Sequence, residues 1–327
     1  MNISLAEKVR YPFLHSQIKK ELLEEFFTIT KEDEQFLRKV KQKKNLLALA
    51  LLLKVHSYVH YFPFKISNLP KPIIDYVAKQ LKRNPKDLES YDNLRSVKQY
   101  HSKIIRKYLG FSTFEDKAEI VNAWIYEHAG KTDIHIDIVK ESIRRIIVEK
   151  IELPSLSVIE KLASSAVVKA NKNLYDRIDK SLTAEQKLMI ESLIRETQGS
   201  KASELRLLKI IPGRANINTL HDQIKLLKKL KAFNITKSLM RTIPVNKRNH
   251  FADQGTEYNI RDLRNFNAER RHAILSCFVY RNYTKTIDNI LSVLIKIVRG
   301  MHNRSIEKFE TIWLRKIAKS ASNFRIL

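Results

Sequence analysis

The chain has 327 residues, 43% of them hydrophobic, and its 61 Lys and Arg against 35 Asp and Glu give a net charge of +26. This apolar fraction excludes a disordered tail, and the excess of positive charge is too large for an ordinary cytosolic enzyme and favours a polyanionic partner. The single cysteine, Cys277, excludes an internal disulfide and a cysteine-based zinc site.

The basic residues run along the whole chain, which favours nucleic acid over a membrane as the partner. A peripheral membrane protein usually concentrates its positive charge on one amphipathic helix. The longest apolar run, residues 46–55, is too short to span a bilayer, and the first residues do not resemble a signal peptide. We therefore expect a cytoplasmic protein with no membrane partner.

Helical spacing dominates the first part of the chain, which has few glycines and prolines. Thr30 is a predicted N-cap, and the helix after it is expected to run to about Tyr61. Pro72 suits the first turn of a helix over 73–82. A further helix over 94–109 is expected to stop at Gly110.

The second part of the chain continues in the same pattern. Further helices are expected around Trp124, up to about Lys150, and over 155–178, 183–196, 220–233, 259–280 and 284–299. The stretch 197–203 is the most linker-like. The prediction is an all-α chain of several small helical, helix-turn-helix-like domains in series, with boundaries at 1–130, 131–198 and 199–327.

The stretch 95–111 contains five basic side chains and no acidic one. On a helical wheel, its apolar side is formed by Val97, Tyr100, His101, Ile104, Ile105 and Tyr108. The other side carries the side chains that bind phosphates and base edges, and the predicted DNA contacts are Arg95, Lys98, Gln99, Ser102, Lys103, Arg106 and Lys107. The alternative is an ordinary solvated helix face.

Two further stretches repeat this pattern more weakly. The predicted helix over 155–178 places Lys161, Ser164, Ser165 and Lys172 opposite a row of apolar residues, and its small side chains suit either a DNA groove or tight helix packing. Arg214, Asn216 and Asn218 surround the start of the helix near 220, where backbone N–H groups could bind phosphate or a side chain could cap the helix. The arginine-rich stretch 261–271 suits either phosphate contacts or an ion-pair network.

The other motifs in the sequence do not indicate a metal-binding or catalytic site. His56 and His60 have the spacing of metal ligands, but no third ligand accompanies them, and core histidines explain them better. No nucleophile motif, phosphate-binding loop or set of acids suited to a two-metal nuclease is present. We therefore expect no catalytic residue, metal, cofactor or small-molecule substrate in this chain.

Five segments resemble, in order, the N-terminal third of the large replicative transposases of the Tn-three family: 46–81, 91–111, 151–162, 214–220 and 267–291. The most specific are the "YD…R…H…I..YLGF" element and the "A.RR…L..F…..T.D" element. The resemblance implies a bacterial, nucleoid-associated chain whose successive helical domains bind the terminal inverted repeats of a transposon as double-stranded DNA. It also implies that the dimerisation region and the metal-dependent strand-transfer domain lie further on.

Alternatives to this interpretation stay open. The chain could be part of a longer transposase, in which a homodimer is more readily expected, or a short relative that represses transposition. It could instead be an RNA-binding or scaffold protein. RNA readers stack bases on exposed aromatic rings, and Tyr100, Tyr108 and Phe111 are expected to face the core, which argues against that class.

Overall fold

The computed structural model describes residues 9–38, 45–195, 204–209 and 213–324. Within these ranges the regular secondary structure is helical, and no β-strand occurs; a single parallel bridge joins Ser112 and Ile151. The predicted all-α fold class is confirmed. The predicted linker at 197–203 lies outside the described residues.

The chain divides into two compact units, residues 1–170 (unit 1) and 171–327 (unit 2). The boundary falls inside a continuous helix, α10 (Leu156–Ser181). The three-domain division expected from the sequence has its boundaries elsewhere, and it stays a prediction about parts that fold separately.

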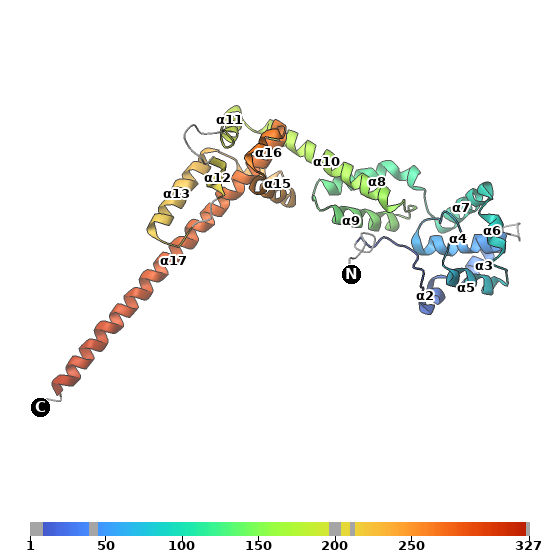
Figure 1. Cartoon of the computed structure of the whole chain (residues 1–327), viewed down its shortest axis with the longest axis horizontal. Helices are drawn as coiled ribbons and strands as arrows, with labels where there is room; N and C mark the ends of the chain where they lie inside the picture. The colour runs from blue at the N-terminus through green and yellow to red at the C-terminus, as the bar shows by residue number, and fades with distance from the viewer. Residues whose placement is uncertain (1–8, 39–44, 196–203, 210–212, 325–327) are drawn as a thin grey trace. The chain divides into compact units, whose positions relative to one another are not determined.

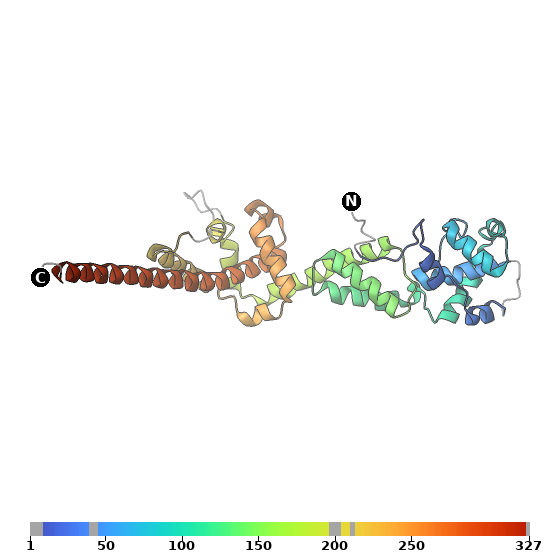
Figure 2. The ribbon, with the colours of Figure 1, turned by 90° about the horizontal axis from the view of Figure 1, so that it is seen from below.

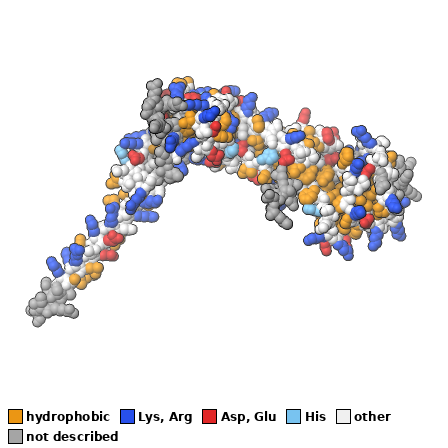
Figure 3. Space-filling view, in the orientation of Figure 1, with side chains coloured by type: hydrophobic (Ala, Val, Ile, Leu, Met, Phe, Trp, Pro, Cys, Tyr) orange, Lys and Arg blue, Asp and Glu red, His pale blue; other side chains and the backbone are white. Residues whose placement is uncertain are grey.

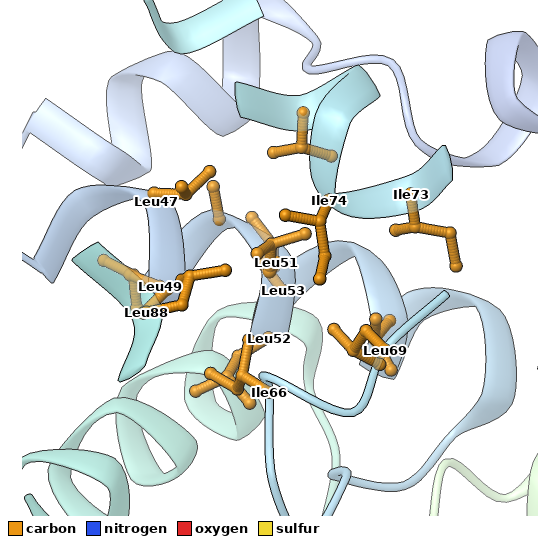
Figure 4. Close-up of a cluster of buried hydrophobic side chains, with 14 of the residues drawn as sticks. Leu47, Leu49, Leu51, Leu52, Leu53, Ile66, Leu69, Ile73, Ile74 and Leu88 are labelled. Carbon is orange, nitrogen blue, oxygen red and sulfur yellow. The ribbon is translucent and has the colours of Figure 1, made fainter. Parts of the chain in front are cut away.

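Unit 1 is built around one fully buried helix, α4 (Leu46–Val59), which carries the longest apolar run of the chain. Its leucines are buried on every side, because neighbouring helices contact it all round. Figure 4 shows this cluster, with Ile66, Leu69, Ile73, Ile74 and Leu88 packed around the α4 leucines. The surrounding helices are α2 (Lys20–Phe26), α3 (Lys31–Arg38), α5 (Lys71–Leu81), α6 (Asp87–Tyr91) and α7 (Arg95–Leu109).

A buried ion pair fixes α3 against α4. Lys54 Nζ lies 2.7 Å from Asp33 Oδ2, and both residues are 8% exposed. The Thr30 hydroxyl accepts a hydrogen bond from the Asp33 N–H at 3.2 Å, which confirms Thr30 as a helix cap. The predicted single helix from Thr30 to about Tyr61 is wrong, because residues 21 positions apart would be separated by about 32 Å on a straight helix and could not form this pair.

A second core in unit 1 is formed by α8 (Phe114–Ala129), α9 (His135–Val148) and the first part of α10. Backbone hydrogen bonds join it to the first core: Ser112 N–H donates to the Lys150 carbonyl at 2.9 Å, and Leu153 N–H donates to the His60 carbonyl at 2.8 Å. Main-chain hydrogen bonds therefore connect the two cores of unit 1.

Unit 2 packs its helices on α17 (Ala268–Phe324), mainly through α15 (Val245–Glu257) and α13 (Ile217–Ala232). It also contains α11 (Ala184–Ser192), α12 (Glu204–Leu208), α14 (Lys237–Arg241) and α16 (Ile260–Asn265). A Cβ added at Gly255 of α15 would lie 2.6 Å from Phe278 Cβ of α17, so glycine permits this close approach. The neighbouring Cys277 is fully buried, and burial raises the pKa of its thiol to about 12, although Arg248 and Arg281 act in the opposite direction.

An ionic network closes one end of the unit 2 core. The His272 ring lies between two carboxylates, with Nδ1 2.6 Å from Asp179 Oδ1 and Nε2 2.9 Å from Glu191 Oε1. Burial raises the pKa of Asp179, but hydrogen bonds from Lys187 and His272 outweigh it and hold that pKa below its usual range. The network therefore links α10, α11 and α17 by charge as well as by packing.

The helix α17 is continuous over 57 residues, which corrects the two separate helices predicted on either side of residues 281–283. Near residues 281–283, polar side chains donate hydrogen bonds to carbonyl groups of the preceding turn of the same helix. Asn282 Nδ2 donates to the Phe278 carbonyl and Thr284 Oγ1 to the Arg281 carbonyl, both at 2.9 Å. Figures 1 and 2 show the C-terminal half of α17 extending beyond the rest of unit 2. The large apolar side chains exposed on that half include Val298, Met301, Phe309 and Trp313.

None of the described helices combines the length and the apolar composition needed to cross a membrane.

Candidate nucleic-acid interface

The best candidate surface lies on α7, which begins and ends close to where the sequence predicted. Gly110 ends the helix in the left-handed conformation, with φ of 75°. Toward the core, His101 and Ile105 are buried, and the Tyr91 hydroxyl lies 2.8 Å from His101 Nδ1. Burial lowers the pKa of His101, which favours the neutral ring, and the contact with Tyr91 fixes the helix against α6.

The orientation of α7 about its axis differs from the prediction. Ser102, expected among the DNA contacts, is only 8% exposed, whereas Tyr100, expected in the core, is 57% exposed. Tyr108 is also partly exposed, at 39%. The helix is therefore turned by about a quarter of a turn relative to the expected arrangement.

A loop on the expected contact side explains this rotation. Residues 62–69, here called the Phe64 loop, lie against α7, and Lys98 Nζ donates to the carbonyls of Pro63, at 2.8 Å, and of Phe64. Burial lowers the pKa of Lys98, while Asp92 has the opposite effect. Lys98 thus uses its ammonium group to hold the Phe64 loop in place.

The Arg106 side chain is also occupied by contacts within the protein. Its Nη1 lies 2.7 Å from Glu152 Oε2, and its guanidinium lies 5.6 Å from the centre of the Phe62 ring. Of the seven residues predicted on this helix, Ser102, Lys98 and Arg106 are therefore buried or occupied.

The remaining predicted residues of α7 share an exposed side, and Tyr100 joins them. We call this set the α7 surface: Arg95, Gln99, Tyr100, Lys103 and Lys107. It combines long cations, which reach phosphates, with a glutamine amide, which can read an adenine edge. The signal that could have identified Tyr100 is its spacing of three and seven residues from the two lysines, which puts all three on one ridge.

The candidates on α10 lie where the sequence placed them. Lys161, Ser164, Ser165 and Lys172 are exposed, and the opposite side, including Ile159 and Ala163, is buried. Ser164 Oγ is 3.1 Å from His135 Nε2, so this hydroxyl already has a partner.

Of the three candidates near α13, one caps the helix and the other two are exposed. Asn216 Oδ1 accepts from the Thr219 N–H at 2.8 Å, which makes Asn216 the N-cap of α13. Arg214 and Asn218 are exposed. The capping explanation thus accounts for Asn216 without a ligand.

The arginine-rich stretch 261–271 forms a network inside unit 2. Arg264 donates to the Ile194 carbonyl, with its Nε at 3.0 Å, and Arg271 Nε lies 2.8 Å from Glu191 Oε1. The guanidinium of Arg270 lies 3.7 Å from the centre of the Phe266 ring. Arg271 therefore forms an ion pair of the kind that the sequence suggested, while Arg264 and Arg270 contact a carbonyl and an aromatic ring of unit 2.

The turn between α5 and α6 is a basic feature that the sequence reasoning missed. Lys82, Arg83 and Lys86 are all exposed there, and Lys82 adopts a left-handed conformation with φ of 54°. More broadly, Lys and Arg side chains, blue in Figure 3, occur over the visible surface of both units. The positive charge is therefore not confined to one helix.

His56 of α4 and His60, which follows that helix, pack against aromatic rings. His56 is fully buried between the rings of Phe62 and Phe111, and neither of its ring nitrogens has a hydrogen-bond partner. Within the described ranges, no group of three or more His, Cys, Asp and Glu side chains is arranged to hold a metal ion.

His56 should make unit 1 sensitive to acid. Burial lowers the pKa of His56 from 6.5 to about 3, with smaller contributions in the same direction from His60 and Arg106. The unfolded chain binds a proton below about pH 6.5 that the folded unit excludes, so stability falls as the pH drops from 6.5 toward 3. We expect His56→Leu to reduce the loss of unfolding free energy between pH 8 and pH 5 by about 2 kcal/mol.

Urea unfolding at the two pH values measures this difference. The matched control is His15→Leu, which removes an exposed imidazole. An equal loss in the His56→Leu variant and the unaltered chain would show that His56 is not the group responsible.

Comparison with known proteins identifies relatives of both units. Residues 3–166 match the family described as "Domain of unknown function (DUF4158)". The transposase for transposon Tn501 of Pseudomonas aeruginosa is 26% identical over 291 residues, covering 87% of this chain and 29% of that protein. The transposase for transposon Tn1546 of Enterococcus faecium is 24% identical over 292 residues, covering 88% of this chain and 30% of that protein.

The chain thus spans about 30% of the length of the curated relatives it matches. The matched part of those relatives is their N-terminal region. The family match covers all of α7 and most of unit 1, and the transposase matches continue into unit 2. The chain therefore belongs to the DUF4158 family and is homologous to the N-terminal regions of Tn-three-family transposases.

Proposed function

We propose that the chain binds double-stranded DNA in a sequence-specific way and recognises the terminal inverted repeats of a transposon. In this proposal it acts as the N-terminal part of a transposase and does not catalyse strand transfer itself. The observation that carries the proposal is the α7 surface, which presents Gln99, Lys103 and Lys107 together on a chain homologous to transposase N-terminal regions.

The chemistry of the α7 surface supports this role. Lysine ammonium groups neutralise phosphates and release counterions, which provides affinity and register. Gln99 can form a bidentate pair with adenine, and Arg95 with guanine, each contributing about 1–3 kcal/mol of discrimination. Helices α5 and α6 precede α7, in the order expected for a recognition helix, and Tyr91 at the end of α6 contacts His101 of α7.

Within this proposal, we rank the predicted contact residues by their exposure and by the bonds they already form. Those on the α7 surface come first, and the exposed residues of the other helices come second: Lys161, Ser165, Lys172, Arg214 and Asn218. Ser102 is buried, and Lys98, Arg106, Ser164 and Asn216 are bonded within the protein. These five contribute through positioning in our proposal.

The proposal places the chain in the bacterial cytoplasm, at the nucleoid, with duplex DNA as its partner. A homodimer would form through regions that follow this part in a longer transposase. A short relative that occupies the same ends would repress transposition, and it would use the same α7 surface.

A competition gel-shift tests the proposal. The probe is a labelled duplex carrying the terminal inverted repeat of the transposon that encodes the chain, and the competitors are a random duplex and a duplex RNA. We expect the terminal repeat to be preferred by about 100-fold or more, with binding unchanged in EDTA. Equal competition by all three would contradict sequence-specific recognition.

The RNA competitor is needed because Tyr100 is exposed. Its exposure removes the argument that no aromatic side chain of α7 could stack on a base. Preferential binding of the RNA duplex would therefore favour an RNA-binding protein over the proposed DNA-binding module.

A further inference from the structure

The Phe64 side chain is the most exposed of the large apolar residues in the part of the chain that the structure describes, at 89%. Leaving a phenylalanine ring in water forgoes the free energy that its burial would provide. The neighbouring apolar residues of the same loop are used differently: Ile66 is fully buried and Leu69 is 6% exposed. The exposure of Phe64 therefore belongs to this one position and not to the whole loop.

The backbone on both sides of Phe64 is fixed by hydrogen bonds. Before it, Lys98 Nζ donates to the carbonyls of Pro63 and of Phe64 itself. After it, the Asp92 carboxylate accepts from the N–H groups of Ile66, at 2.8 Å, and Ser67, at 3.0 Å. Both anchoring side chains belong to the α6–α7 segment, so the loop is held in place by the elements of the candidate interface.

The surroundings of the ring are positively charged. Lys98 Nζ lies 5.8 Å from the centre of the Phe64 ring, and the next residue, Lys65, is exposed. Arg95, one helical turn before Lys98, is exposed as well. Two carboxylates near this loop are engaged within the protein: Asp92 accepts from backbone N–H groups of the loop, and Glu152 pairs with Arg106.

An exposed aromatic ring on a rigid loop among cations has the chemistry of a base-stacking residue. Nucleobases stack on aromatic side chains, and DNA-binding proteins also insert apolar side chains between base steps. A protein partner would require a wider apolar patch, whereas the other exposed residues of the Phe64 loop, Lys65, Ser67 and Asn68, are basic or polar.

We propose that Phe64 is a nucleobase-contacting residue, whose ring stacks on or wedges against a base of the DNA that the α7 surface holds by its phosphates. This inference rests on the proposed function and adds a contact that a reading of the basic residues does not include. Lys98 is its positioning residue, since Lys98 sets the backbone from which the ring projects.

The test compares the full chain with Phe64→Ala and Phe64→Trp on the terminal-repeat duplex, with 2-aminopurine substituted at single positions. We expect Phe64→Ala to weaken binding by about tenfold to 100-fold and to leave the slope of log K against log salt unchanged, because no phosphate contact is lost. A 2-aminopurine fluorescence change at one or two positions should occur with the unaltered chain, disappear in Phe64→Ala and return in Phe64→Trp.

The matched control is Ile120→Ala, which truncates another exposed apolar side chain of unit 1, one that is 45% exposed. Helicity measured by circular dichroism should be the same in all variants, because neither side chain is part of a core. If Phe64→Ala binds the duplex as tightly as the unaltered chain, with the same 2-aminopurine signal, this inference is overturned while the proposed function stands. If the unaltered chain shows no preference for the terminal repeat, the proposed function itself fails.

Discussion

Replacing both Lys103 and Lys107 with Glu should nearly abolish specific binding of the terminal-repeat duplex. Both side chains are exposed on the α7 surface, and neither is needed for the core. Two lost phosphate contacts should lower the magnitude of the log K against log salt slope by about 2, and the two added negative charges should weaken binding by about 100-fold near 0.1 M salt. Fluorescence anisotropy across a salt series measures both quantities.

The matched control for this pair is Lys308→Glu with Lys316→Glu. These lysines are exposed on α17 and outside every candidate surface, and the change in net charge is the same. A similar loss in both double variants would mean that total charge, and not the α7 surface, determines binding.

Replacing Gly255 with Ala should destabilise unit 2 selectively. The new methyl group would meet Phe278 Cβ at 2.6 Å, and because a Cβ position does not depend on the rotamer, the backbones of α15 and α17 would have to separate. Overpacking of this kind costs about 1–3 kcal/mol or more and outweighs the gain of about 1 kcal/mol in helix propensity. We expect a net loss of about 2 kcal/mol in the unfolding transition of unit 2, with that of unit 1 unchanged.

Gly300→Ala supplies the control within the same unit. Gly300 lies inside α17, and nothing is within 4 Å of the position that its Cβ would occupy. This variant should gain up to about 1 kcal/mol from helix propensity. Denaturant unfolding of the two variants, followed by circular dichroism, separates close packing from backbone preference, and a stabilised Gly255→Ala variant would contradict the packing argument.

Local sequence signals predicted the individual helices well where a cap or a stop residue marked them. Thr30 caps a helix as expected, the helix predicted from residue 183 is capped by Thr183, and Gly110 ends α7. These features depend on residues that are close together in the chain, so a single sequence contains the information.

The orientation of α7 could not be predicted in the same way. Which side of an amphipathic helix is buried depends on what packs against it, and the Phe64 loop comes from a segment more than 30 residues earlier. Ser102 is small enough to be covered, and Tyr100 is apolar enough to look like a core residue. The separation of α3 from α4 likewise depends on a tertiary contact, the Lys54–Asp33 pair.

The buried thiol of Cys277 can be used to measure how often the core of unit 2 opens. It is the single cysteine among 327 residues, and its raised pKa suppresses the thiolate, which is the form that attacks disulfide reagents. Modification therefore has to wait until the core of unit 2 exposes this side chain. The labelling rate of the unaltered chain thus measures how often unit 2 opens and is blind to unit 1, so each part of the molecule can be followed without introducing a probe.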